Sequence, residues 1–198
     1  MIRYVAFLRA INVAGQKLIK MEALARIFAS IGFHNVRTYI QCGNVIFDHA
    51  SGNSVRLRKK IERTLQDVLG YEVTVILRPL AEIEAIVERN PFRKIKADGD
   101  VMLCVVFLSA EPPSKPKLPL ISATEKLEVF EVRDHAAFIV ARRKKSGWFG
   151  FPNNFVEKEL GVLATTRQVT TVRKIVDFAN ANPTGRSVAR KKSNSTSP

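Results

Sequence analysis

Apolar positions in the first 92 residues follow two different spacings. Short runs rich in β-branched and aromatic residues predict strands at 2–8, 36–48 and 72–77. Apolar residues three or four positions apart predict amphipathic helices within 21–31, 57–69 and 80–87. The run 36–48 is expected to be a hairpin that turns at Gly43-Asn44, because glycine accepts a positive φ. The resulting order, β-α-β-β-α-β-α, begins with the split βαβ pattern of a ferredoxin-like antiparallel sheet.

Helix ends in this half carry local signals. Ser54 is the expected N-cap of the second helix, Gly70 its end, and Pro79 the start of the third.

The pattern changes after Phe92. A polar, turn-rich stretch at 93–100 suggests a boundary, and the wholly apolar 101–108 predicts a strand covered on both faces. Four prolines then favour an extended connection, with some helical structure expected near 120–126. A second hairpin is predicted from 127–133 and 136–142. We therefore expect an N-terminal half (1–92), an α+β C-terminal half (93–182) and a disordered basic tail (183–198).

Two short helices close the second half. Asn153 or Asn154 is expected to cap one helix, which runs to Leu160, and Thr170 or Thr171 is expected to cap the last.

Charge adds a possible class of partner to this picture. The 198 residues carry a net charge of +14. A strongly basic chain attracts polyanions such as nucleic acid, anionic membrane surface or phosphorylated ligands, although a solvated basic surface explains the same charge. Two cysteines exclude a disulfide-dense scaffold and fit a reducing compartment. With no signal-peptide pattern and no apolar run of roughly 20 residues, we expect a cytoplasmic protein without a membrane partner.

The loop between the first strand and first helix is the first candidate site. Arg9, Asn12, Gly15 and Lys17 precede a helix, whose exposed N–H groups could hold a phosphate or carboxylate. The spacing is not that of a Walker P-loop. The alternative is that Asn12 bonds its own turn and the lysine is solvated.

The first hairpin carries a second polar cluster, formed by Thr38, Gln41, Cys42 and Asn44. The hairpin tip could bring Gln41 towards Arg9 in one pocket, but a turn needs the same residue types for local bonding. Cys42 lacks an indicated His-Asp partner, so a nucleophilic role is the weaker interpretation.

Cations and aromatic side chains mix near the end of the second hairpin. Arg142, Arg143, Lys144 and Lys145 precede Trp148, a composition able to contact phosphates and stack bases. The alternative is a hairpin end held to the core by its aromatics. The three histidines lack metal-ligand spacing, so we expect no metal site and no cofactor.

Several motifs together resemble a known family. They are the stretches 7–17 (F-L-R-A-I-N-V-A-G-Q-K), 19–21 (I-K-M), 36–47 (V-R-T-Y-I-Q-C-G-N-V-I-F), 90–92 (N-P-F) and 165–172 (T-T-R-Q-V-T-T-V). They are similar to the uncharacterised bacterial family called domain of unknown function 1697. The resemblance implies an α+β fold with two ferredoxin-like halves and no assigned activity.

The chain departs from that family's pattern at identifiable positions. Ala10 and Ala14 stand where the family usually has glycine, and Cys42 where it usually has serine. The family's Arg-Asn-Trp corresponds to Arg167-Gln168-Val169. A site that needs a hydroxyl at 42 or a ring at 169 would be altered, whereas Arg167 is kept as a candidate ligand contact.

Two functions remain open from the sequence. The first is a non-catalytic binder of an anionic ligand, either nucleic acid or a nucleotide, through Arg9, Asn12, Lys17 and the 142–145 cations. The alternative is an enzyme acting on a phosphorylated small molecule, oriented by the 9–17 loop and polarised by Gln41 or Thr38.

Overall fold

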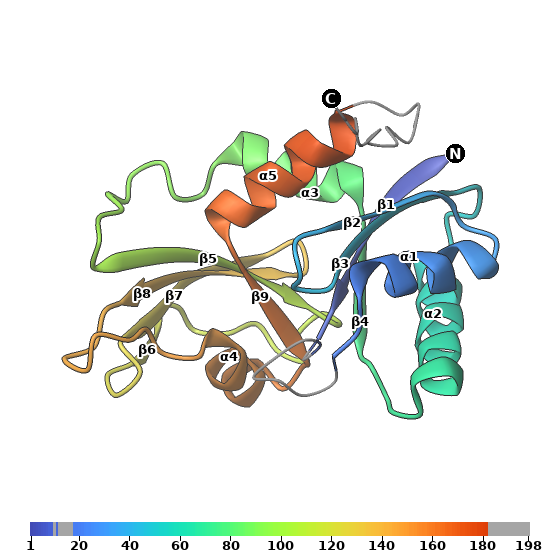
Figure 1. Cartoon of the computed structure of the whole chain (residues 1–198). Helices are drawn as coiled ribbons and strands as arrows, with labels where there is room; N and C mark the ends of the chain where they lie inside the picture. The colour runs from blue at the N-terminus through green and yellow to red at the C-terminus, as the bar shows by residue number, and fades with distance from the viewer. Residues whose placement is uncertain (10, 12–17, 182–198) are drawn as a thin grey trace, which may run out of the picture.

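The computed structural model describes residues 1–9, 11 and 18–181 (Figure 1). The helices are α1 (Met21–Ser30), α2 (Ser54–Leu69), α3 (Leu80–Arg89), α4 (Pro152–Leu160) and α5 (Val169–Asn180). The strands are β1 (Ile2–Leu8), β2 (His34–Tyr39), β3 (Asn44–His49), β4 (Val75–Pro79), β5 (Val101–Leu108), β6 (Leu120–Ser122), β7 (Leu127–Arg133), β8 (Ala136–Arg142) and β9 (Ala164–Gln168). The predicted tail, 183–198, lies outside the described residues.

The first sheet has the strand order β2-β3-β1-β4, and all neighbours are antiparallel. Strand β3 lies between β1 and β2 of the first β-α-β unit, and β1 lies between β3 and β4 of the second unit. This is the ferredoxin-like arrangement expected from the element order. Helices α1 and α2 cover one face of the sheet and bury residues such as Tyr4, Leu24, Phe28 and Leu65.

The second sheet has the order β6-β7-β8-β5-β9. Its last four strands repeat the order of the first sheet, with α4 in the place of α2. Residues 109–126, all described, contain no helix between β5 and β7. The helical structure expected near 120–126 was therefore wrong, because Leu120–Ser122 pairs with Leu127–Val129 as the short strand β6.

Other boundaries differ from the prediction for local reasons. The first hairpin turns over residues 40–43, and Asn44 is the first residue of β3, because Gly43 (φ 67°) closes the turn. Asn53, not Ser54, caps α2 by accepting a hydrogen bond from the backbone N–H of Arg56. Strand β4 begins at Val75 instead of Glu72.

The last two helices start without the predicted caps. Helix α4 begins at Pro152, which fits the first helical position because proline lacks an N–H, and α5 begins at Val169 after an extended Gln168. Neither has a side-chain cap, so Asn153, Asn154, Thr170 and Thr171 all lie inside helices.

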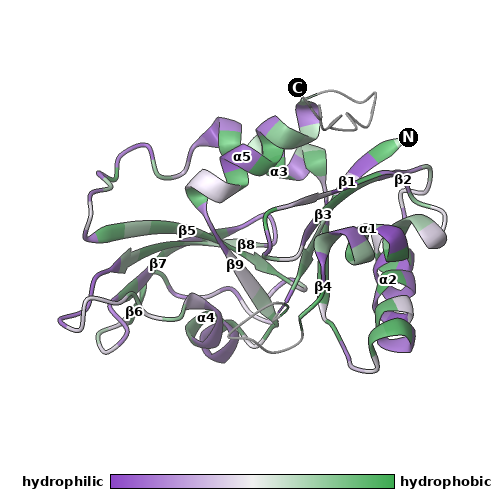
Figure 2. Ribbon diagram, in the orientation of Figure 1, coloured by the Kyte–Doolittle hydropathy of each residue, from purple (hydrophilic) through white to green (hydrophobic). Residues whose placement is uncertain are grey.

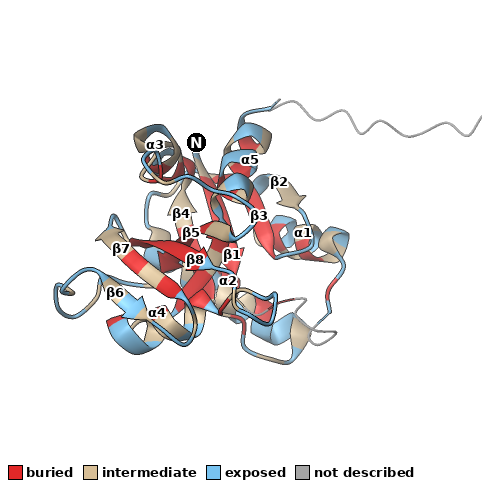
Figure 3. Cartoon of the chain, turned by 90° about the vertical axis from the view of Figure 1, so that its left-hand side faces the viewer, coloured by how far each residue is buried: buried red, intermediate tan, exposed pale blue. Residues whose placement is uncertain are grey.

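The two sheets share a central core that also includes one face of α3 and of α5. The rings of Phe7 in β1 and Phe107 in β5 stack with centroids 4.2 Å apart. The opposite face of the second sheet packs on α4. Figure 1 shows α3 and α5 side by side above the sheets, and Figure 3 shows the buried strands in the middle of the molecule. The apolar strands and the mixed helix faces are visible in the hydropathy colouring of Figure 2.

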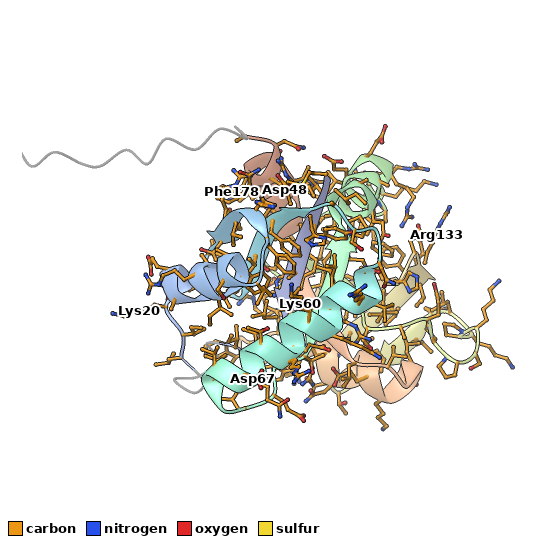
Figure 4. All side chains as sticks on the ribbon, turned by 90° about the vertical axis from the view of Figure 1, so that its right-hand side faces the viewer. Lys20, Asp48, Lys60, Asp67, Arg133 and Phe178 are labelled. Carbon is orange, nitrogen blue, oxygen red and sulfur yellow. The ribbon has the colours of Figure 1, made fainter. Side chains whose placement is uncertain are left out.

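The C-terminal end of α5 is tied to the first sheet. Arg3 and Arg37 both donate to the carbonyl of Ala179, at 2.7 and 2.9 Å, and Asp48 pairs with Arg3 at 2.8 Å. The Arg37 guanidinium also lies over the Phe178 ring. Phe178 of α5 and Asp48 of β3 are labelled in Figure 4. Within the described part of the chain, a helix long and apolar enough to span a bilayer is not found.

Candidate functional site

The candidate site is centred on Arg167, whose side chain lies between the two halves. Strand β9 pairs with β5, and this register places Arg167 opposite Val105. Its guanidinium lies over the Phe7 ring of β1, with the carbon 5.3 Å from the ring centroid. The residue is only 9% exposed.

Uncharged groups accept most of the hydrogen bonds that the Arg167 guanidinium can donate. Nε donates to Oδ1 of Asn44 at 2.6 Å, and Nη2 donates to the carbonyl of Cys42 at 3.0 Å. Nη1 donates to Oγ1 of Thr165 and the carbonyl of Thr166, at 2.9 and 2.8 Å. These bonds satisfy four of the five N–H groups that an arginine carries. They also join the last strand of the second half to the hairpin of the first.

The positive charge of Arg167 is not neutralised by a neighbouring carboxylate. No ion pair to this side chain forms among residues 1–9, 11 and 18–181. Burial lowers the pKa of Arg167 to about 10, because the charged form has lost its hydration. The side chain is still protonated at neutral pH and would gain from a nearby anion.

A pocket of about 580 Å³ opens beside Arg167. We call it the Arg167 pocket. Its lining residues come from the end of β1, the first hairpin, the start of α4, strand β9 and the first turn of α5. They are Leu8, Arg9, Ile11, Ile40, Cys42, Asn153, Asn154, Thr165, Thr166, Arg167, Gln168 and Thr171.

Arg9 also lines this pocket, as the sequence suggested, but its charge is already paired. Nε and Nη2 donate to the two carboxylate oxygens of Glu157 in α4, each at 2.9 Å. One of these oxygens also accepts the backbone N–H of Ala164, at 2.8 Å. A bidentate pair fixes the guanidinium plane, so Arg9 forms a wall of the pocket with little net charge.

The predicted residues of the first hairpin differ in their relation to the pocket. Asn44 is buried and binds Arg167, while its amide nitrogen donates to the carbonyl of Tyr39 at 3.1 Å. Cys42 lines the pocket, with its neighbour Ile40. Thr38, half-buried in β2, and Gln41, exposed in the turn, are not among the lining residues.

Three predicted site residues cannot be placed. Asn12, Gly15 and Lys17 lie outside the described residues. Of the ligand contacts proposed from the sequence, Arg9 and Arg167 both line the Arg167 pocket.

The predicted cluster of cations and Trp148 at 142–148 does not line this pocket, and its cations are mostly paired. Arg142 binds Glu128 at 3.1 Å, Arg143 binds Asp100 at 2.9 Å, and Lys144 binds Glu125 at 3.0 Å. The Arg143 guanidinium also lies over the Phe149 ring. Lys145 is exposed, and so is Trp148, with 77% of its surface accessible.

Sequence reasoning missed six polar residues that line the pocket: Asn153, Asn154, Thr165, Thr166, Gln168 and Thr171. Asn153 accepts a hydrogen bond from the Thr166 hydroxyl at 2.6 Å, which joins α4 to β9. The asparagines and Thr171 were interpreted as helix caps, and β9 was not predicted as a strand. One signal for this part of the site was available in the sequence. In both halves an arginine near the end of a strand is followed by a helix, at R-P-L-A-E (78–82) and at R-Q-V-T-T (167–171).

A metal-binding cluster of three or more histidine, cysteine or acidic side chains is not found in the described part of the chain. His34, His49 and His135 do not line the Arg167 pocket.

Comparisons with known proteins support the fold through a solved structure and show the family through a family model. A conserved bacterial protein from Streptococcus pneumoniae has a similar structure, with a TM-score of 0.62 at 19% identity. The match covers 90% of this chain and 98% of that protein. No curated protein gives a significant match. The family model described as "Protein of unknown function (DUF1697)" matches residues 1–138. The chain therefore belongs to this family, as its N-terminal motifs predicted.

Proposed function

We propose that the protein binds a small anionic ligand in the Arg167 pocket and does not transform it. The observation that carries this proposal is the charge of Arg167, which is buried at the pocket wall without a carboxylate partner among the described residues. Burying a charge is costly unless the charge is paired. Neutral acceptors satisfy its hydrogen bonds, whereas an anion in the pocket would also compensate its charge.

The polar groups that line the pocket with Arg167 support a ligand with hydrogen-bonding atoms of its own. Asn153, Asn154, Gln168 and Thr171 supply amide and hydroxyl groups, while Leu8 and Ile40 supply apolar surface. This combination, a mostly preformed pocket with a few convergent polar groups, is typical of small-molecule sites.

The lining residues favour binding over catalysis. Cys42 is a potential nucleophile, but the described lining residues include no imidazole that could act as its base. The Glu157 carboxylate, which pairs with the lining residue Arg9, already accepts hydrogen bonds from Arg9 and from the Ala164 N–H.

The test replaces Arg167 and uses Arg78, a half-buried arginine between the two halves, as a control. Anions that raise the thermal midpoint of the wild-type protein should have no such effect on Arg167→Gln. This variant lacks the one cation that has no carboxylate partner among the described lining residues. Arg78→Gln removes a comparable set of hydrogen bonds between the halves, to the carbonyls of Leu108 and His135, and should keep the response.

A thermal-shift panel of phosphorylated and carboxylated metabolites, followed by calorimetric titration, measures both variants. Each substitution should lower stability by about 1–3 kcal/mol through lost buried hydrogen bonds. If no anion stabilises the wild type, or if both variants lose the response equally, the proposed pocket is wrong.

A further inference from the structure

The two halves of the chain repeat each other residue by residue around their central strands. In the first half, Leu8 pairs with Val75 and Val5 pairs with Arg78. In the second half, Leu108 pairs with Ala164 and Val105 pairs with Arg167. Arg78 and Arg167 therefore occupy equivalent positions on β4 and β9.

The backbone bonds that flank these strands repeat as well. Leu8 N–H donates to the carbonyl of Gly43 at 2.8 Å, and Leu108 N–H donates to that of His135 at 2.9 Å. The residue before each following helix is extended, with φ −56° and ψ 140° at Pro79 and φ −62° and ψ 145° at Gln168. The strand-to-helix geometry is thus the same in both halves.

Each arginine faces a pocket, and the two pockets are built from equivalent parts. The pocket beside Arg78, which we call the Arg78 pocket, has a volume of about 290 Å³. It is lined by the start of α2, strand β4, the first turn of α3, the residue after β5 and the second hairpin. The Arg167 pocket uses the start of α4, strand β9, the first turn of α5, the end of β1 and the first hairpin, with about 580 Å³.

The two pockets differ at the residue four positions after the arginine. In the Arg78 pocket this residue is Glu82, whose carboxylate oxygen lies 3.7 Å from Nε of Arg78. Nε of Arg78 has no hydrogen-bond partner among the described residues. The Glu82 carboxylate therefore offsets the positive charge of Arg78 without a direct hydrogen bond to Nε. In the Arg167 pocket the equivalent residue is Thr171, which has no charge.

We infer that the ligand of the Arg167 pocket is a small monocarboxylate, whose carboxyl group takes the place beside Arg167 and the first turn of α5 that the Glu82 carboxylate holds beside Arg78. The inference rests on the proposed function and deepens it. Among the described lining residues, Arg167 is the one cation without a carboxylate partner, and together with the positive end of α5 it matches a single negative charge. Arg9 contributes no second free charge, since Glu157 pairs with it. The larger volume leaves room for the rest of the ligand beside Asn153 and Asn154.

The first experiment places a carboxylate in the pocket. Thr171→Glu restores the arrangement of Arg78 and Glu82, and should weaken binding of a monocarboxylate probe at least tenfold. Thr171→Gln, of the same size but neutral, should bind within about threefold of the wild type. Benzoate, pyruvate and inorganic phosphate serve as probes, and shifts of the arginine Nε–H resonances report occupancy of the pocket.

The second experiment creates the missing site in the other half. Glu82→Thr should open the Arg78 pocket to the same probe and raise the number of bound monocarboxylates from one to two. Glu88→Thr, an exposed position on α3 that does not line the pocket, makes the same charge change and should leave one site.

The outcomes separate the two levels of the proposal. Phosphate binding more tightly than every monocarboxylate, with loss in Arg167→Gln, would overturn the carboxylate class and leave the anion pocket standing. Equal binding by Thr171→Glu and Thr171→Gln would overturn the placement of the carboxyl group. A wild-type protein that binds none of the three probes, nor any anion of the broader panel, would overturn the proposed function itself.

Discussion

Among single residues, Gly43 is restricted both by space and by backbone conformation. Its φ of 67° is in the left-handed region, and an added Cβ would lie 2.5 Å from Cγ2 of Ile11 and 3.0 Å from Cβ of Leu8. The carbonyl of Gly43 also accepts the N–H of Leu8. Because the next residue, Asn44, binds Arg167, the close approach of this turn to β1 positions one wall of the pocket.

Gly43→Ala is expected to destabilise the protein by about 2–4 kcal/mol, from left-handed strain together with overpacking. Urea denaturation measures the loss. Gly32→Ala is the matched control, since Gly32 also has positive φ (84°) but nothing within 4 Å of its added Cβ. It should cost only the backbone strain, about 1–2 kcal/mol. Equal losses at the two positions would show that crowding by Ile11 has no effect.

Residue chemistry alone could indicate part of the site. Arg9, Cys42 and Arg167 were candidates from the sequence, and all three line the pocket. That Glu157 neutralises Arg9 could not be foreseen, because the two residues are 148 positions apart and meet only through the packing of α4 against the end of β1.

At the level of the elements, α5 depends on charges contributed by the first half. Its final carbonyls, which have no partners within the helix, accept hydrogen bonds from Arg3 and Arg37. Asp48 holds Arg3 through two hydrogen bonds, of 2.8 and 3.1 Å, and also accepts one from Asn35. The hydrogen bonds from Arg3 are the main cause that lowers the pKa of Asp48.

Asp48→Asn is therefore expected to reduce stability at pH 7 by about 1–3 kcal/mol. A carboxyl whose pKa is lower in the folded state stabilises the protein above its unfolded pKa, about 4, and loses this effect as the pH falls through the folded value. The difference between wild type and variant should consequently shrink below pH 4. Urea denaturation at several pH values measures it.

Asp67, exposed on α2 and labelled in Figure 4, provides the control. Asp67→Asn should change the free energy of unfolding by less than about 0.5 kcal/mol at pH 7. A constant difference between Asp48→Asn and wild type from pH 7 to pH 2 would contradict the assigned role of the carboxylate.

Strands with a continuous apolar run could be predicted from the sequence, whereas a strand made mostly of polar residues could not. The strands at 101–108, 127–133 and 136–142 were predicted to the residue, since their apolar runs are bounded by turns. Strand β9 reads A-T-T-R-Q, which has no apolar alternation, and it becomes a strand because β5 offers it a free edge. The missed strand is the one that carries Arg167.

For the whole molecule, the α+β class followed from the sequence, whereas the packing of the sheets on each other did not. Val5 and Phe7 face the central core, while Tyr4 and Ala6 face α1 and α2. A strand buried on both faces shows no polar alternation, so its sequence does not reveal which face meets which partner.

The net charge of +14 predicts oligonucleotide association that weakens steeply with salt. We expect deletion of residues 183–198, which carry Arg186, Arg190, Lys191 and Lys192, to reduce it more than Lys145→Ala combined with Trp148→Ala. The reason is that Arg142, Arg143 and Lys144 are already ion-paired. Fluorescence anisotropy at low and moderate salt measures oligonucleotide binding by both variants. The reverse order would instead identify the loop at 142–148 as the nucleic-acid contact.

The reciprocal arginines also give the two halves a symmetric relation to each other. Arg78 of the first half bonds to the second half, and Arg167 of the second half bonds to the first. Each half thus presents both a donor and its complementary acceptors, which is the pattern of a two-fold symmetric homodimer. The protein has the architecture of such a dimer fused into a single chain. Within one chain the two pockets need not be identical: Glu82 lies beside Arg78, whereas the uncharged Thr171 lines the pocket of Arg167.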